Sequence, residues 1–403
     1  MEPKSTGGQW TALILATLAF AVCFVVWGLI APLAPYFRQT YGLSATEVGL
    51  LVAVPVLLGS LARIPLGLLT DRFGGRAVFT ILLLALLVPT ALAGLASSYG
   101  ALLAVSLLLG LAGASFAVGV PFVAGWFPPD RQGVALGVYG MGNIGTAIAS
   151  ALAPRLGWPA AFWALLPVLL VMAVLYWLLG RNAPGFTPRR DSLAQRFAIF
   201  RERPLTWVLA LFYFVTFGGF VAIGIYLPTL LVSEYGLTPA DAGGRAAGFV
   251  VLATLARPLG GYLADRWGGA PVLDLVFLVV TVLAVVLAFG PGMTLITVAF
   301  LGIAFVLGLG NGAVFKLVAE RFPGHTGTVT GLVGAAGGLG GFFPPLLMGF
   351  VRDATGTYAI GFMLLSEFAL VCFIVNLLVL QQRASLLTAG DRRPPADASG
   401  SRH

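Results

Sequence analysis

Long apolar runs, separated by short polar or glycine-rich breaks, follow one another along almost the whole chain. A helix rises about 1.5 Å per residue and a hydrocarbon core is about 30 Å thick, so each run is long enough to cross a membrane. Six runs precede an arginine-rich polar stretch, and six follow it. The predicted spans are residues 10–35, 45–70, 76–96, 99–127, 132–153, 158–180, 204–232, 240–266, 271–290, 292–319, 326–350 and 357–381.

This pattern predicts an all-α integral membrane protein with twelve transmembrane helices. Residues 1–180 and 204–381 would form two six-helix bundles, joined by a cytoplasmic linker at 181–203. The first apolar run is too long for a signal-peptide core, so we expect it to be retained as a helix. Residues 382–403 are polar and should form a disordered cytoplasmic tail.

Composition and charge agree with a membrane protein and add its orientation. The chain is 59% hydrophobic and 9% charged, with a mean hydropathy of +0.98. If the N-terminus is cytoplasmic, sixteen of the 23 Lys and Arg residues fall in cytoplasmic segments, four in outer loops and three within helices. Since cytoplasmic loops are enriched in basic residues, we expect both termini in the cytoplasm of a multi-pass protein of the inner (plasma) membrane.

The net charge of +8 then reflects this orientation, and no nucleic-acid-binding pattern accompanies it. Cys23 and Cys372 each lie alone in an apolar run, which predicts packing residues rather than a disulfide or a thiolate metal site.

One phrase occurs twice. Residues 61–75 are LARIPLGLLTDRFGG and residues 255–269 are LARPLGGYLADRWGG, an offset of 194. A second phrase, WFPPDRQGVALGVYGMGNIGTAIAS from Trp126, matches RFPGHTGTVTGLVGAAGGLGGFF from Arg321 at an offset of about 195. The two halves are therefore duplicates with the same orientation, which is the plan of a transporter with its site between the halves near the membrane midplane.

Each copy of the first phrase places an arginine inside a span. Arg63 lies eight residues before Asp71, and Arg257 lies eight before Asp265. Each arginine is therefore about 12 Å from the cytoplasmic end of its helix, near the bilayer centre. Charged residues at that depth usually face a cavity and mark a substrate path, although bonding to neighbouring carbonyls is the structural alternative. Two arginines without acids at their depth indicate an anion site.

By these residues the chain resembles the major facilitator superfamily and, more narrowly, its nitrate/nitrite porters. Residues 67–76 (GLLTDRFGGR) resemble the superfamily's loop motif between the second and third helices. The glycine-rich segments GVYGMGNIGTAIAS from Gly137 and GLVGAAGGLGGFFPP from Gly331 resemble the paired nitrate signature. The resemblance covers residues 10–381 and implies the major facilitator fold with transport of nitrate or nitrite.

The resemblance also implies roles for individual residues. Arg63 and Arg257 would clasp the anion from the two halves, Tyr213 and Asn143 would hydrogen-bond it, and aromatic rings would enclose it above and below. The implied substrate-binding residues are Arg63, Arg257, Tyr213, Asn143, Phe116, Phe217, Phe315, Gly142 and Gly338. The implied cytoplasmic gate comprises Asp71, Arg72, Arg76, Asp265 and Arg266, with the two aspartates capping neighbouring helix N-termini.

A guanidinium group suits a small planar oxyanion because it is a planar fork of donors and stays charged. Enclosing two unpaired arginines is costly, so loading with an anion should favour the closed state, and exchange of nitrate for nitrite is the expected mode. Lys316 and Glu367 suggest proton coupling as the alternative. Lys316 can also be explained by snorkelling or by an i,i+4 pair with Glu320.

Other function classes fit the sequence less well. An intramembrane enzyme would need a nucleophile–base pair or a metal cluster, but the chain has two histidines, His325 and His403, both outside the helix cores. A sensor would normally add a soluble signalling domain. A porter for another small anion, such as formate or oxalate, is the nearer alternative. We expect a monomeric carrier in the lipid bilayer that needs no cofactor or metal and binds no nucleic acid.

Overall fold

The computed structural model describes residues 6–188 and 193–381, so the expected tail at 382–403 lies outside the described residues. Every regular element of the described chain is helical. The first half contains α1 Thr6–Gly28, α2 Ile30–Tyr41, α3 Ala45–Leu61, α4 Arg63–Phe73, α5 Gly75–Ala93, α6 Tyr99–Leu109, η1 Gly110–Ala114, α7 Ser115–Ala124, η2 Pro129–Arg131, α8 Gln132–Gly140, η3 Met141–Asn143, α9 Ile144–Leu156, α10 Ala160–Trp163 and α11 Leu165–Leu179.

The second half is built from longer, less interrupted helices. They are α13 Leu205–Tyr235, α14 Pro239–Trp267, α15 Gly269–Ala288, α16 Met293–Arg321, α17 Thr326–Thr355 and α18 Ala359–Asn376, followed by the π-helical turn η4 Leu377–Gln381. Between the halves, the linker contains a helix that the polar pattern did not predict, α12 Leu193–Glu202.

Eleven stretches of the described chain are long and apolar enough to cross a membrane. The 30-residue α17 is long enough to be the twelfth predicted crossing. The first span continues to Tyr41, beyond the predicted end at residue 35, because Pro35 is accommodated within α2. Gly42, with φ of 64°, then ends the helix in the left-handed conformation that glycine tolerates.

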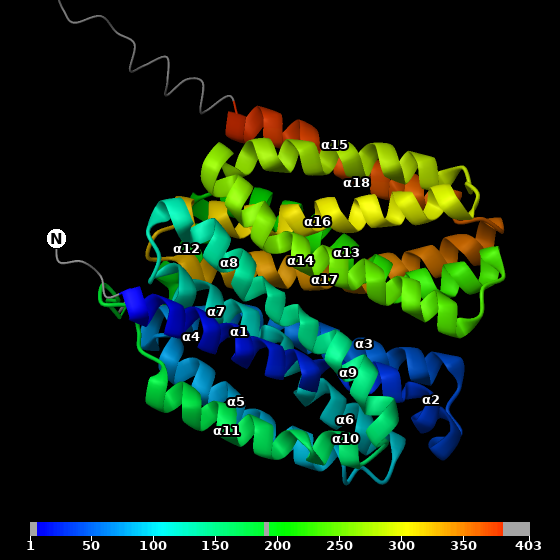
Figure 1. Cartoon of the computed structure of the whole chain (residues 1–403), viewed down its shortest axis with the longest axis horizontal. Coiled ribbons are helices and arrows are strands. Elements are labelled where there is room, and N and C mark those ends of the chain that lie inside the picture. The colour runs from blue at the N-terminus through cyan, green and yellow to red at the C-terminus, as the bar shows by residue number, and fades with distance from the viewer. Residues whose placement is uncertain (1–5, 189–192, 382–403) are drawn as a thin grey trace, which may run out of the picture.

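Figure 1 shows the two halves of the chain as two groups of helices, blue to green for the first and green to red for the second. α8 of the first half lies against α14 of the second, and α4 lies against α17. The α14 helix contacts α8 far more extensively than it contacts α9. The α9 helix continues the same span toward the predicted outer side. The halves therefore meet most closely through the segments that lead to the predicted cytoplasmic side.

A 3-10 turn explains why the two repeated phrases differ by one residue in their offset. Gly133 packs on α14 and Gly327 on α4, and these two are 194 residues apart. Gly145 packs on the α1 backbone and Gly340 on the α13 backbone, 195 residues apart. A 3-10 helix rises about 2.0 Å per residue against about 1.5 Å in an α-helix. The three residues of η3 therefore span about the same length along the helix axis as four residues of the continuous α17. Gly145 and Gly340 consequently keep equivalent positions, although their offset is one residue longer.

Candidate anion-binding site

Arg63 and Arg257 come together between the two halves. Arg63 is the first residue of α4, directly after the break that separates α4 from α3, and Arg257 lies within the continuous α14. They are 3% and 2% exposed. The guanidinium carbons lie 5.3 Å (Arg63) and 5.4 Å (Arg257) from the centre of the Phe217 ring. The duplicated sequence thus brings two buried cations to one aromatic side chain.

Each arginine also reaches across to the other half. The Arg63 Nη1 group donates to the carbonyl oxygen of Gly334 at 2.5 Å, and the Arg257 Nη1 group donates to that of Gly140 at 3.4 Å. Gly140 and Gly334 are 194 residues apart, the same offset as the arginines. Because these acceptors are backbone atoms, the side chains gave no sign of them in the sequence. The repeat offset of 194 could have shown that Gly140 and Gly334 are equivalent positions.

The two arginines differ in how well their donors are satisfied. Arg63 has a second bond, from Nε to the Gly113 carbonyl oxygen at 3.1 Å. The Nε and Nη2 atoms of Arg257 are buried and make no hydrogen bond of normal geometry, although the Tyr213 side chain interacts with this guanidinium. Among the described residues, no carboxylate forms an ion pair with either arginine. The structural alternative, a carbonyl-bonded arginine, therefore fits Arg63 better than Arg257.

The four aromatic residues singled out by the resemblance form one cluster around the arginines. Tyr213 stacks on Phe217 with ring centres 5.0 Å apart. Phe315 meets Tyr213 and Phe116 edge to face, each at 4.7 Å. Phe116 comes from α7, Tyr213 and Phe217 from α13, and Phe315 from α16. Such a cluster encloses charge in a low-dielectric slot, where electrostatic interactions are stronger than in water.

Asn143 and Gly142 lie near the Arg257 side of the cluster. The buried Asn143 donates from Nδ2 to the Gly140 carbonyl oxygen at 2.8 Å, so it shares that acceptor with Arg257. Gly142 packs against Phe20 of α1, where a Cβ would come within 2.2 Å of the ring. The glycine thus allows α1 to approach closely. Of the two residues, Asn143 is the one that has a polar side chain near Arg257.

Gly338 lies on the Arg63 side and packs against Ser60, whose Oγ would be 2.0 Å from an added Cβ. Together with Trp27, Phe217 and Arg63, these residues line a closed cavity of about 10 Å³. A space of that size holds at most about one water molecule. This space on the Arg63 side must therefore widen before a polyatomic anion can bind there.

The two aspartates of the repeated phrase cap helices of the opposite half. Asp71 accepts hydrogen bonds from the backbone N–H groups of Gly327 (3.0 Å) and Thr328 (2.8 Å) at the start of α17, and from the Thr328 hydroxyl at 2.7 Å. Asp265 accepts from the N–H groups of Gly133 and Val134 at the start of α8, both at 2.8 Å. A carboxylate at a helix N-terminus is favoured by the helix dipole. These contacts hold the halves together at this end.

The three gate arginines suggested by the resemblance lie elsewhere. Arg76 donates to the Trp177 carbonyl oxygen and stacks on the Trp177 ring at 4.4 Å, which ties α5 to α11 within the first half. The exposed Arg72 and Arg266 lie over the neighbouring rings of Phe73 and Tyr262. In the part of the chain that the structure describes, the side-chain bonds between the halves at this end come from Asp71, Asp265 and Lys316 rather than from these arginines.

Lys316 and Glu367, the two candidates for proton coupling, lie in different surroundings. Lys316 is 5% exposed, lies 3.2 Å from Asp265, and donates a short hydrogen bond to the Pro129 carbonyl oxygen of the first half. It also lies 3.9 Å from Glu320, the predicted i,i+4 partner. Glu367 lies on the exposed surface of α18, outside the central cluster. The structure thus brings Lys316, but not Glu367, to the contact between the halves.

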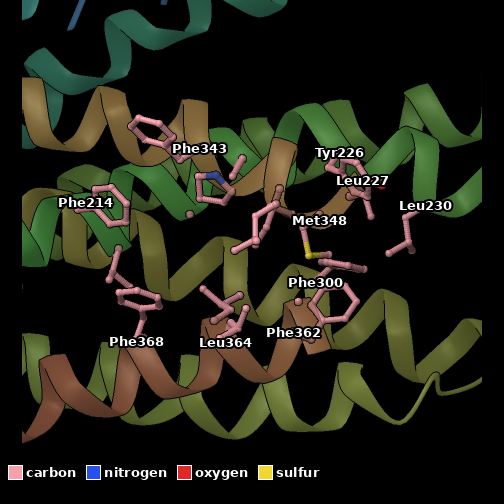
Figure 2. Close-up of a pocket in the computed structure, with 18 residues that line it drawn as sticks. Phe214, Tyr226, Leu227, Leu230, Phe300, Phe343, Met348, Phe362, Leu364 and Phe368 are labelled. Carbon is pink, nitrogen blue, oxygen red and sulfur yellow. The ribbon is translucent and has the colours of Figure 1, made fainter. Parts of the chain in front are cut away.

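A larger cavity lies within the second half, away from both arginines. Its volume is about 550 Å³, and α13, α16, α17 and α18 line it with apolar side chains. Figure 2 shows Phe214, Met348, Phe362 and Phe368 among the side chains around this space. It offers no charged group, so size alone does not identify the anion site.

Comparison with known proteins agrees with this architecture. A sequence model of the Major Facilitator Superfamily matches residues 16–345 and 214–400. The nitrite extrusion protein of Bacillus subtilis is 44% identical over 91% of this chain and 93% of its own length. The probable nitrate/nitrite transporter NarK2 of Mycobacterium tuberculosis is 42% identical over 90% and 95%. The probable nitrate transporter NarT of Staphylococcus haemolyticus is 39% identical over 92% and 96%.

Solved structures share the fold at lower identity. The human organic anion transporter MFSD10 superposes with a TM-score of 0.78 at 17% identity, covering 91% of this chain and 99% of that one. The E. coli fucose:proton symporter FucP gives 0.75 at 19% identity, covering 90% and 97%. The chain therefore belongs to the major facilitator superfamily and, within it, to the nitrate/nitrite porters, a family of membrane transporters rather than enzymes.

Proposed function

We propose that this protein carries nitrate and nitrite across the plasma membrane by exchange, one anion inward for one outward. The observation that carries the proposal is the burial of Arg63 and Arg257, from opposite halves, around Phe217 without a carboxylate partner among the described residues. Its relatives named for nitrate, nitrite or both support the choice of anion. Arg63, Arg257, Tyr213 and Asn143 would bind the anion, and Phe116, Phe217 and Phe315 would exclude water from it.

The chemistry of the cluster suits a small, flat, monovalent oxyanion. Guanidinium groups present several N–H donors in one plane and are less strongly hydrated than an ammonium group. The free Nε and Nη2 groups of Arg257 would supply charge-assisted hydrogen bonds to the anion, and the Tyr213 hydroxyl would add another. Formate and other small organic anions remain the competing substrates, and unlabelled anions competing against nitrate uptake would rank them.

Alternating access would follow from rocking of the two halves about this site. With the Asp71 and Asp265 caps formed, passage to that end is closed. To open it, both carboxylates must leave the helix N-termini of the opposite half. We propose that this end faces the cytoplasm, since the basic residues gather there, and that a single chain, which supplies both halves of the site, suffices for transport.

Exchange would result from the cost of closing an empty site. Two enclosed cations without an anion are unfavourable in a low dielectric, so the loaded carrier would change conformation much faster than the unloaded one. The test is to reconstitute the protein in vesicles loaded with nitrate and to follow nitrite entry. We expect entry to be at least about tenfold slower into anion-free vesicles, and equal rates would overturn obligatory exchange.

One observation favours proton-coupled nitrate symport as the second candidate. Lys316 and Asp265 form a buried ion pair that also bonds the first half through Pro129, Gly133 and Val134. Opening this end must break the bonds of Lys316 and Asp265 to the first half, so a change in the charge of this pair would alter the rate of opening. An imposed pH gradient should leave nitrate–nitrite exchange unchanged, whereas symport predicts nitrate accumulation that a protonophore abolishes.

A further inference from the structure

Asn311 is a buried amide whose hydrogen-bonding groups are all unused. It lies within α16, is 3% exposed, and neither Oδ1 nor Nδ2 has a partner. Leaving a buried polar group unpaired costs about 1–3 kcal/mol, and nearly all such groups in proteins have partners. By contrast, Asn143 and Asn376 each donate from Nδ2. An unpaired amide at this depth therefore requires an explanation.

The contacts of its neighbours locate the Asn311 side chain. Gly308 and Gly312, on one side of it, pack on the backbone of α14, with an added Cβ at Gly312 lying 2.5 Å from the Arg257 carbonyl oxygen. Gly310 packs on Thr216 of α13, the residue before Phe217. Phe315, one turn further along the same face, belongs to the aromatic cluster. Asn311 thus lies between α13 and α14 at the level of Arg257 and Phe217.

The internal repeat shows which amide side chain the second half lacks. Asn143 places an amide near Arg257 from the first half, but its counterpart at an offset of 195 is Gly338, which has no side chain. The second half therefore lacks an amide at the matching place. It has Asn311 instead, on α16, one residue before Gly312, which packs on the Arg257 carbonyl oxygen. The Nε and Nη2 atoms of Arg257 are also unpaired.

Building on the proposed function, we propose that Asn311 is a further anion-binding residue, with Nδ2 donating to an oxygen of the bound nitrate and Oδ1 accepting from the free N–H groups of Arg257. One arrangement would then satisfy both unpaired groups. Nitrate has three oxygens and nitrite two, so the additional donor favours nitrate. Asn311 is therefore a determinant of the preference for nitrate over nitrite.

The test measures transport of both anions in proteoliposomes. Asn311→Leu keeps the approximate size of the side chain and removes its polar atoms. We expect it to raise the KM for nitrate about tenfold and the KM for nitrite about twofold or less, with a smaller change in maximal rate. Asn311→Asp, which places a negative charge beside the anion, should abolish transport. Thr90→Val is the matched control, because the Thr90 hydroxyl is also buried and unpaired but lies on α5 in the first half.

The outcomes separate this inference from the proposed function. If the wild-type protein moves neither nitrate nor nitrite, the proposed function fails. If it moves both and Asn311→Leu keeps the wild-type ratio of the two KM values, only the role of Asn311 is overturned. Should Asn311→Leu not fold, Asn311→Ser should still show a shifted KM ratio and a smaller nitrate-induced rise in Tm than wild type, and a wild-type ratio with a wild-type rise in Tm would overturn the inference.

Discussion

Arg63 and Arg257 occupy equivalent positions of an internal repeat, yet their surroundings differ. Arg63 donates to two backbone carbonyls, at 3.1 and 2.5 Å, whereas Arg257 makes one long bond of 3.4 Å to an oxygen that Asn143 also uses. Both guanidinium groups lie over Phe217. Duplication therefore copied the charge and its place in the helix but not its hydrogen bonds. Arg63 is held in place by its two bonds, while the Nε and Nη2 atoms of Arg257 have no hydrogen-bond partner.

The two caps at the end of the repeated phrase differ in a parallel way. Asp71 is bonded by two backbone N–H groups and the Thr328 hydroxyl. Asp265 is bonded by two backbone N–H groups and lies 3.2 Å from the buried Lys316. Since Lys316 also donates to Pro129, the cap of the second half includes a cation that reaches the first half. The halves thus contribute equivalent carboxylates with different additional partners.

The largest effect should come from replacing the arginines by lysine. Arg257→Lys removes the planar fork whose unpaired N–H groups would bind the proposed anion, and we expect nitrate–nitrite exchange to fall at least about 100-fold. Arg63→Lys should reduce exchange less, by about tenfold, because an ammonium group can still bond the carbonyls of Gly113 and Gly334. Exchange in proteoliposomes measures both. Equal losses would contradict the difference between the two arginines, and wild-type rates in both variants would remove them from the site.

A smaller effect is expected from neutralising the caps. Asp265→Asn removes the charge that Lys316 and two N–H groups share, and hydrogen bonds to charged groups contribute about 1.5–3 kcal/mol. Hydrogen exchange of the Gly133 and Val134 amides should therefore rise, with a drop in anion exchange of about tenfold. Asp71→Asn should affect the Gly327 and Thr328 amides less, because Thr328 can also bond an amide side chain.

A double-mutant cycle between Asp265→Asn and Lys316→Met isolates the ion pair from the helix cap. The cycle should give a favourable coupling, since each single variant leaves a buried group without its partner. Additive effects would show that the cap alone holds the halves together.

The smallest effect concerns the glycine that replaces an asparagine in the second repeat. Gly338→Ala would place a methyl group 2.8 Å from the Ser60 Cβ and closer still to its Oγ. Overpacking of this kind costs about 1–3 kcal/mol, and we expect exchange to slow about threefold to tenfold. Ser60→Gly in the same chain should restore part of the rate. Failure of that rescue would mean that Gly338 is needed for a reason other than its contact with Ser60.

Much of the fold could be predicted from the apolar pattern. The all-helical membrane architecture and the family are confirmed, and the equivalent places of Arg63 and Arg257 followed from the repeated phrase. The predicted helix caps at these aspartates agree with the observed bonds to α17 and α8. The pattern missed α12 in the linker and the continuation of the first span to Tyr41, because both contain polar residues on an exposed face.

The candidate site was less accessible to sequence reasoning. The acceptors for the arginines are the backbone carbonyls of Gly113, Gly140 and Gly334, and every residue has such a group. Asn311 lies in the apolar α16, and only the structure shows that its buried amide has no hydrogen-bond partner. The location of Lys316 between the halves likewise depends on Pro129, 187 residues away in the chain.

The sequence alone indicates apolar helices long enough to cross a membrane, the duplication of the two halves and the equivalent places of Arg63 and Arg257 in them. These properties depend on side-chain transfer energies and on helical rise, which are local and periodic. The tertiary structure alone decided which arginine is satisfied, where the 3-10 turn absorbs one residue of the repeat, and which polar groups meet at the centre. Those outcomes depend on hydrogen-bond geometry between distant segments, which changes over a fraction of an ångström and leaves no periodic trace in the sequence.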